Sequence, residues 1–153
     1  MPFIHGFTSA GAGFLLAVLW FDLMFDEQVR RQSDGPLPVE ILASISGYYR
    51  RVTAEAWPMN RLVAGVMLLT LLSIIVEIVA STEHRWIGWT SLLAAASAIG
   101  LAGVRTVPNA MRLGREVDSI ATRSDLARTI YRDHVFCFAA IASLLLLQLS
   151  TLL

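Results

Sequence analysis

Residues 57–80 read WPMNRLVAGVMLLTLLSIIVEIVA, an apolar run long enough to cross a bilayer as one helix. Three further apolar stretches cover residues 3–25, 86–107 and 135–153. None of them alternates apolar and polar residues as barrel strands do, and backbone groups in hydrocarbon must then be paired within helices. The sequence therefore predicts an all-α, polytopic membrane protein built as a four-helix bundle.

Only two polar segments of any length remain, residues 26–56 and 108–134, so we expect a single membrane domain over residues 1–153. All twelve basic residues are arginine, and a chain without lysine can neither form a Schiff base nor supply the lysine of a phosphate loop. The single cysteine, Cys137, excludes an internal disulfide and a Cys-x-x-Cys redox site. A formal net charge of zero gives no reason to expect nucleic acid as a partner.

The distribution of arginine predicts the orientation of the spans. The two long connections hold most of them, namely Arg30, Arg31, Arg50 and Arg51 in the first and Arg112, Arg115, Arg123, Arg128 and Arg132 in the second. Only Arg85 lies between the second and third spans. The positive-inside rule then places both connections in the cytoplasm and both termini on the outer, periplasmic side of the inner (plasma) membrane.

Each long connection has helical features. In the first, a turn signal over residues 32–38 is followed by apolar residues at helical spacing, namely Val39, Leu42, Ile45, Tyr49 and Val52. This pattern predicts an amphipathic helix at the membrane surface before the second span. In the second, Pro108 removes a backbone donor and biases Val107 away from helical angles, so we expect the third span to end or kink there. The composition of residues 111–130 favours a short surface helix or a helical extension.

Polar residues gather at the cytoplasmic ends of all four spans. They are Asp22, Asp26, Asn60, Arg61, Arg105, Asn109, Arg132, Asp133 and His134. One interpretation is a set of ion pairs that fix helix register. The other is a small-molecule site in which His134 exchanges a proton, Asp22 or Asp26 orients it, and Arg105 or Arg61 holds an oxyanion. In that site His134, Arg105 and Asp22 are the catalytic candidates, and the substrate-binding candidates are Asn109, Asp26, Asn60 and Arg61.

Two other polar sets were considered as sites. His134 with Asp22 and Asp26 contains the donors of a two-carboxylate, one-histidine metal site, but ligands from separate spans leave no diagnostic spacing, so we predict no metal and no cofactor. A smaller cluster at the outer ends of the spans contains His5, Glu77, His84 and Gln148. There Glu77 is either protonated because of burial or paired with His84 or Arg85.

These features carry a resemblance to a known family. Four short spans, a surface helix before the second one, the turn Val107-Pro108-Asn109 and the sequence Tyr131-Arg132-Asp133-His134 at the head of the last span resemble the anthrone-oxygenase-like family of small membrane proteins. The similarity covers nearly the whole chain, although Thr106 stands where that family commonly has Asn. The resemblance implies a four-helix bundle and cofactor-independent oxygenation of polycyclic phenolic anthrones, with His134 and Asn109 as site residues.

Two functions are therefore open. In the first, a hydrophobic phenolic polycycle is bound or oxygenated in a cytoplasmic-side pocket, where a base removes a proton and a cation stabilises the anion. The alternative is a non-catalytic accessory subunit of a larger membrane complex, because the chain has almost no soluble mass and no unambiguous catalytic set. Membrane lipid is the expected partner in both cases, with a homo-oligomer also open. A transporter is disfavoured because the middle of each span is nearly free of ionisable groups.

Overall fold

The computed structural model describes residues 2–32, 35–80 and 85–151. Its long helices are α1 (Pro2–Arg30), α3 (Met59–Ala80), α4 (Arg85–Leu101) and α6 (Ile120–Ser150). The shorter elements are α2 (Val39–Arg50), the π-helical turns η1 (Arg51–Glu55) and η2 (Ala102–Thr106), and α5 (Val107–Arg115). Helices α1, α3 and α6, together with the continuous run Arg85–Arg115, are long and apolar enough to cross a membrane. Over the described residues there are no strands, and the predicted all-α multi-pass bundle is confirmed.

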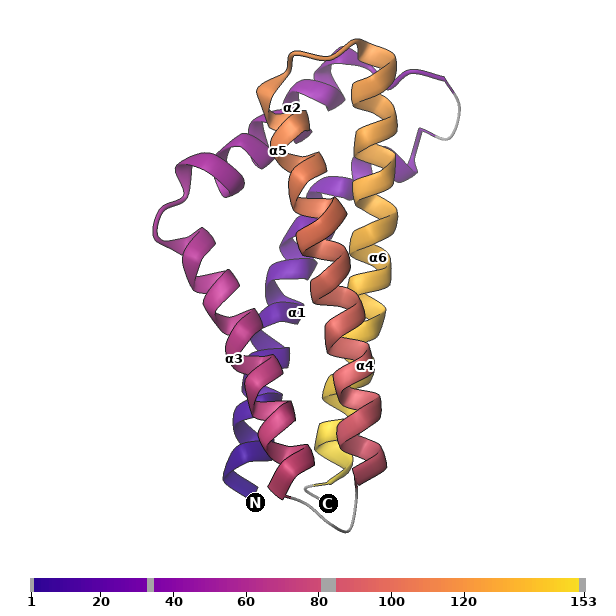
Figure 1. The fold of residues 1–153 in the computed structure, drawn as a ribbon. Coiled ribbons are helices and arrows are strands. Elements are labelled where there is room, and N and C mark those ends of the chain that lie inside the picture. The colour runs from indigo at the N-terminus through magenta and orange to yellow at the C-terminus, as the bar shows by residue number, and fades with distance from the viewer. Residues whose placement is uncertain (1, 33–34, 81–84, 152–153) are drawn as a thin grey trace.

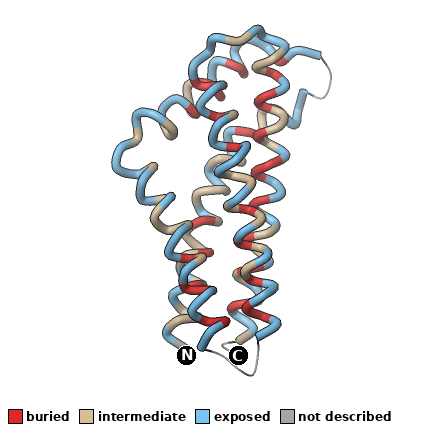
Figure 2. Tube along the Cα trace, viewed as in Figure 1, coloured by how far each residue is buried: buried red, intermediate tan, exposed pale blue. Residues whose placement is uncertain are grey.

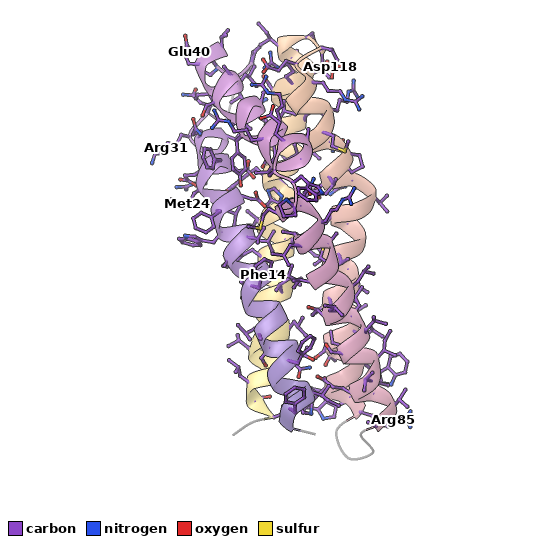
Figure 3. All side chains as sticks on the ribbon, turned by 90° about the vertical axis from the view of Figure 1, so that its left-hand side faces the viewer. Phe14, Met24, Arg31, Glu40, Arg85 and Asp118 are labelled. Atoms are coloured by element: carbon purple, nitrogen blue, oxygen red, sulfur yellow. The ribbon has the colours of Figure 1, made fainter. Side chains whose placement is uncertain are left out.

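The long helices run up and down in chain order (Figure 1). Both termini lie at the same end of the bundle as the end of α3 and the start of α4, whereas α2 and α5 lie at the opposite end (Figure 1). We call the two parts the terminal half and the connection half. The labelled side chains of Arg31, Glu40 and Asp118 lie at the connection end, and Arg85 lies at the terminal end (Figure 3). An even number of spans explains why both termini share one end.

Helices α1 and α6 are longer than the predicted spans. With 29 and 31 residues at about 1.5 Å each, they reach about 44 and 46 Å, against a hydrocarbon core of about 30 Å. Helix α1 continues past the predicted span end near residue 25 to Arg30, and α6 begins at Ile120, ahead of the span predicted from residue 135. Hydropathy missed these extensions because their outer faces are polar, while Val29, Ala127 and Ile130 remain buried on their inner faces. The connection half therefore projects beyond the hydrocarbon.

Helix α2 is the amphipathic helix that the sequence predicts before the second span. Leu42, Ile45 and Tyr49 are buried in one cluster with Leu113 and Ile130, so the apolar side that a surface helix would turn to lipid packs on α5 and α6. The approach is close. A Cβ atom on Gly114 of α5 would lie 2.8 Å from the backbone nitrogen of Arg50, a contact that only glycine avoids.

Of the two outcomes expected at Pro108, an end or a kink of the third span, the structure shows no end: the helix continues, with the irregular turn η2 directly before Val107, and Val107 is helical although the proline was expected to bias it otherwise. Val107 has helical angles (φ −64°, ψ −47°), and its N–H donates to the carbonyl of Ala102 in the π-turn η2. An α-helical proline lacks a donor and clashes with the carbonyl four residues before it. The wider π-turn relieves that clash, and Pro108 then lies in the first turn of α5, where a missing N–H is tolerated.

Helix α3 is packed along only part of its length. Its buried residues are Thr70, Ser73, Ile74, Glu77 and Ile78, all in its C-terminal part. There α3 approaches α4 so closely that a Cβ atom on Gly88 would lie 2.6 Å from Ile78 Cγ1. The N-terminal part of α3 diverges from the other helices (Figure 1) and carries no buried residue (Figure 2). The bundle is therefore closed in the terminal half and open beside α3 in the connection half.

Candidate functional site

A cavity of about 570 Å³ lies where α3 diverges, between α1, α3, α4, η2 and α6, and α2 and η1 also contribute to its wall. This volume is typical of small-molecule sites. Most of the lining is apolar. The polar lining residues are Asp22, Tyr48, Tyr49, Thr53, Asn60, Thr106 and His134. A mostly apolar cavity with a few convergent polar groups is the usual form of a ligand site.

His134 of α6 is held by a buried carboxylate. Its Nδ1 lies 2.7 Å from Oδ2 of Asp26, which has no exposed surface. The Tyr49 hydroxyl donates to the other oxygen of Asp26 at 2.6 Å. Because the carboxylate accepts from Nδ1, the neutral ring carries its hydrogen on Nδ1 and leaves a lone pair on Nε2. Asp26 thus fixes both the orientation and the tautomer of the imidazole.

Asp22 lies on the other side of the same ring. It is one helical turn before Asp26 on α1 and accepts a hydrogen bond of 2.6 Å from the Tyr48 hydroxyl. Its Oδ2 is 3.8 Å from His134 Nε2, which is too long for a hydrogen bond. Within the part of the chain that the structure describes, Nε2 has no hydrogen-bond partner, and His134 lines the cavity. Nε2 is therefore the atom through which the site can exchange a proton with a ligand.

The two tyrosines act as fixed donors. Burial, followed by the nearby charge of Asp22, raises the pKa of Tyr48 well above its usual value. Burial and the charge of Asp26 do the same to the pKa of Tyr49. Both hydroxyls therefore stay protonated at neutral pH and hold the carboxylates in place. The Tyr48 ring also stacks on Phe25, with ring centroids 4.0 Å apart.

Arg105 is placed differently from the sequence hypothesis. Its guanidinium forms a two-pronged ion pair with Asp133, with Nε 2.9 Å from Oδ2, and the Thr106 hydroxyl donates to the same oxygen at 3.1 Å. Asp133 is buried, whereas the Arg105 side chain is 53% exposed and lies outside the cavity lining. This ion pair joins η2 to α6, and the structure does not bring Arg105 to Nε2 of His134.

The remaining predicted site residues divide into two groups. His134, Asp22 and Asn60 line the cavity, and Asp26 lies against His134. Arg61 and Asn109 lie outside the lining. Sequence reasoning did not identify Tyr48, and it assigned Tyr49 only to the apolar stripe of a helix. A buried tyrosine must find a partner for its hydroxyl, and this is the signal that could have drawn attention to Tyr49.

A second buried polar network lies in the terminal half and joins the long helices. Oε1 of Glu77 accepts from the Thr8 hydroxyl at 2.5 Å, and Oε2 accepts from the Gln148 amide at 2.9 Å. The Gln148 amide also donates to Ser91 Oγ at 3.1 Å, and its carbonyl oxygen lies 2.8 Å from Nδ1 of His5. Since that oxygen can only accept, Nδ1 of His5 donates.

Glu77 is paired with two members of the predicted outer cluster, Gln148 and His5, and with Thr8. The proposed partner His84 lies outside the described residues. The imidazole near Glu77 is that of His5, with Nδ1 3.6 Å from Oε2. Thr8 and Ser91, which complete the network, were not identified because a lone hydroxyl in an apolar span has no distinctive pattern. Both carboxylate oxygens of Glu77 accept a hydrogen bond, and the carbonyl oxygen and both N–H groups of the Gln148 amide also have partners. Because all these groups are satisfied, this network is a structural one.

The carboxylates beside His134, which a metal site would need as ligands, are bound to tyrosine hydroxyls and are not arranged around a common point. Each of the two aspartates already accepts a tyrosine hydrogen bond. In residues 2–32, 35–80 and 85–151, no group of three or more His, Cys, Asp or Glu side chains is placed to hold a metal ion.

Comparison of the chain with protein-family models, with curated proteins and with solved structures finds no match.

Proposed function

We propose that the protein binds a hydrophobic molecule bearing a weakly acidic hydroxyl group, such as a phenolic polycycle, in the cavity and that His134 takes up the proton of that group. The observation that carries the proposal is the geometry of His134, whose Nδ1 is fixed by Asp26 at 2.7 Å while Nε2, 3.8 Å from Asp22, has no hydrogen-bond partner among the described residues and lies at the cavity wall. A general base needs this combination of orientation and access.

The charges around His134 suit the transfer. The carboxylates of Asp26 and Asp22 lie beside the imidazole, so the positive charge that it gains on taking up a proton has two negative neighbours. After transfer, the imidazolium lies next to the new phenolate and stabilises it as an ion pair. This assigns to His134 the cationic role that the sequence hypothesis gave to Arg105, whose charge is already engaged with Asp133.

The reaction class that the anthrone resemblance favours is oxygenation by O₂. In the enol tautomer of an anthrone, one hydrogen of the ring CH₂ group has moved to the carbonyl oxygen, and removal of that hydroxyl proton by His134 gives an electron-rich anion. The anion transfers electrons to O₂ and forms a C–O bond at the former CH₂ carbon, which keeps its second hydrogen. The resulting hydroperoxide loses water and leaves a carbonyl group. One oxygen atom enters the product and the other leaves as water, so the four-electron oxidation of the CH₂ group matches the reduction of O₂. The proton held by His134 returns when the hydroperoxide forms.

We also place the protein in an inner (plasma) membrane with the connection half toward the cytoplasm. The support is the arginine distribution, since nine arginines belong to the two long connections and Arg85 lies at the opposite end (Figure 3). Both termini are then periplasmic, and the cavity lies in the cytoplasmic leaflet. Reaction of an externally added, membrane-impermeant thiol or amine reagent with tags at the two ends of the chain tests this placement.

The experiment for the function uses the purified protein in lipid nanodiscs and a dihydroxyanthrone as probe. We expect the wild type to bind the probe as its anion, seen in the absorption spectrum, and to consume one O₂ per anthrone above the uncatalysed rate. His134→Ala should lose the bound anion and lower turnover by about 10²-fold or more. It should also unfold at a lower temperature, because buried Asp26 loses one partner, so binding and turnover are measured well below that midpoint on the folded variant. His5→Ala, which removes an imidazole from the terminal half, is the matched control and should keep both activities.

Retained turnover in His134→Ala, or a wild type that binds no phenol, would overturn the proposal. The accessory-subunit alternative makes a different prediction for the same preparation. A protein that is recovered from its native membrane only in a stoichiometric complex, and that binds no phenol when isolated, would support the subunit function.

A further inference from the structure

The polarity of the cavity changes along the length of the bundle. On α1 the lining runs from Asp22 to Phe14, and on α6 it runs from His134 to Ile141, in both cases away from the connection end. The polar residues therefore lie at one end, and the part toward the middle of the bundle is apolar. From Asp22 to Phe14 the helix rises about 12 Å, which gives the depth of the apolar part. A ligand that fills the cavity needs a polar group at one end only.

The cavity opens on both sides of the N-terminal part of α3. Its exposed lining residues are Ala17 and Phe21 of α1, Met59 and Ala64 of α3, and Val107 of α5. All of them lie in runs long and apolar enough to cross a membrane. The part of α3 that faces the cavity has no buried residue and stands away from the other helices (Figure 1). These openings therefore face lipid rather than water.

The connection end of the cavity is covered by protein. Tyr49 and Asp26 are buried at that end, and Ala110 of α5 is buried beside the cavity. Tyr49 belongs to the apolar face by which α2 packs on α5 and α6. A ligand that came from the cytoplasm would have to displace α2, whereas one dissolved in the bilayer can enter beside α3, and between α1 and α3 it would pass the small side chains of Ala17 and Ala64. The geometry favours the second route.

We infer that the ligand is a membrane-dissolved amphiphile with one polar end, a phenol or hydroquinone that carries a single alkyl or prenyl chain. It enters between α1 and α3 from the cytoplasmic leaflet, places its hydroxyl at Nε2 of His134 and extends its chain toward Phe14 and Ile141. The inference rests on the proposed function for the role of His134, and it adds the rest of the ligand, its orientation and its route. The orientation is that of a lipid in the same leaflet, so the ligand need not turn over.

The test uses para-octylphenol with a photoreactive diazirine at the end of its chain, incorporated with the protein into nanodiscs. After irradiation, we expect mass spectrometry to find the label on deep lining residues such as Met67 and Ile141. Ala64→Trp fills the opening between α1 and α3 from its lipid-facing side and should reduce this labelling at least tenfold. Ala10→Trp is the matched control, because Ala10 is exposed on α1 but lies outside the cavity lining. It should leave the labelling unchanged.

Two results would overturn the inference. One is labelling confined to lipid-facing residues outside the cavity, such as Leu68, and the other is unchanged labelling of Ile141 in Ala64→Trp. Binding of the chain-free anthrone separates the two proposals. If the anthrone binds in a His134-dependent way while the octylphenol does not reach Ile141, the proposed function stands and the lipid-like ligand is wrong. If neither probe depends on His134, the proposed function fails as well.

Discussion

Each half of the bundle buries a carboxylate, and the groups that bind the carboxylate differ between the halves. In the terminal half, Glu77 has a donor for each oxygen and lies among closely packed helices. In the connection half, Asp26 also has its partners, but the imidazole that it holds keeps Nε2 free beside a cavity. This difference distinguishes a structural hydrogen-bond network from a candidate functional site. A polar group at membrane depth stabilises the fold when all its hydrogen bonds are made, and it becomes a candidate site when one atom is left open to a ligand.

Helix α3 takes part in both halves, so it gives the most direct test of the contrast. Ile74 is fully buried in the terminal half, and Val63 lines the cavity. We expect Ile74→Ala to lower the free energy of unfolding by about 4 kcal/mol, because it opens a new cavity in a packed core. Val63→Ala should cost less than about 1.5 kcal/mol, since it only enlarges an existing space. Equilibrium unfolding in mixed detergent micelles measures both values, and equal losses would mean that α3 packs uniformly.

The second prediction concerns the hydrogen bonds of the terminal half. Gln148→Leu removes one donor from Glu77 and leaves Ser91 without its partner, so we expect a loss of about 3 kcal/mol in unfolding free energy. Ser143→Leu, at an exposed position of the same helix, is the control and should have little effect. Phenol binding in the connection half should not change. Loss of binding in Gln148→Leu would show that the halves are coupled.

The smallest effect is expected at the water-exposed end of the connection half. Arg112 Nη2 lies 2.8 Å from Asp118 Oδ1, and this hydrogen bond lowers the pKa of Asp118 below its usual value. The pair therefore adds a little stability above the ordinary pKa of an aspartate, and that stability is lost as the pH falls through the lowered value. Asp118→Asn should melt slightly below wild type at neutral pH and low salt.

That difference should vanish at high salt, because the pair is exposed to solvent and is screened. It should vanish as well when the pH is below the lowered pKa of Asp118. A difference that persists in strong salt would indicate that the pair is shielded from water, contrary to the position of Asp118 at the connection end (Figure 3).

The sequence predicts the spans because burial in hydrocarbon leaves a long and simple signal. It also predicts α2, since the spacing of Leu42, Ile45 and Tyr49 is preserved whether the helix packs on lipid or on protein. Hydropathy does not predict the direction of α3 relative to the other helices, because the residues of α3 that face lipid and those that face the cavity are equally apolar. The cavity therefore could not be foreseen, although the residues at its polar end were identified.

The candidate site was predicted as a group of residues but not as a set of contacts. Asp22 and Asp26 share one face of α1, so their proximity to each other follows from helical spacing. Arg105 is a different case. Adjacent residues on a helix point about 100° apart, and the sequence cannot say whether the arginine reaches Asp133 or His134. The structure places it on Asp133, and the imidazole faces the cavity instead.

The π-turn η2 has a consequence for how substitutions along the third span would be tolerated. A π-turn holds one residue more than an α-helical turn, so the side chains beyond it are set back by about 100° around the axis relative to a continuous α-helix. The side chains of α4 and those of α5 therefore have different helical phases, and the change of phase is complete at Thr106. In a residue-by-residue scan of Arg85–Arg115, sensitive positions should recur regularly up to Leu101 and then restart out of step. Deleting one residue of η2, such as Gly103, would convert the π-turn into an α-helical turn and merge the two phases in the sequence. The side chains of α5 would still face α2, but Pro108 would clash with the carbonyl four residues before it.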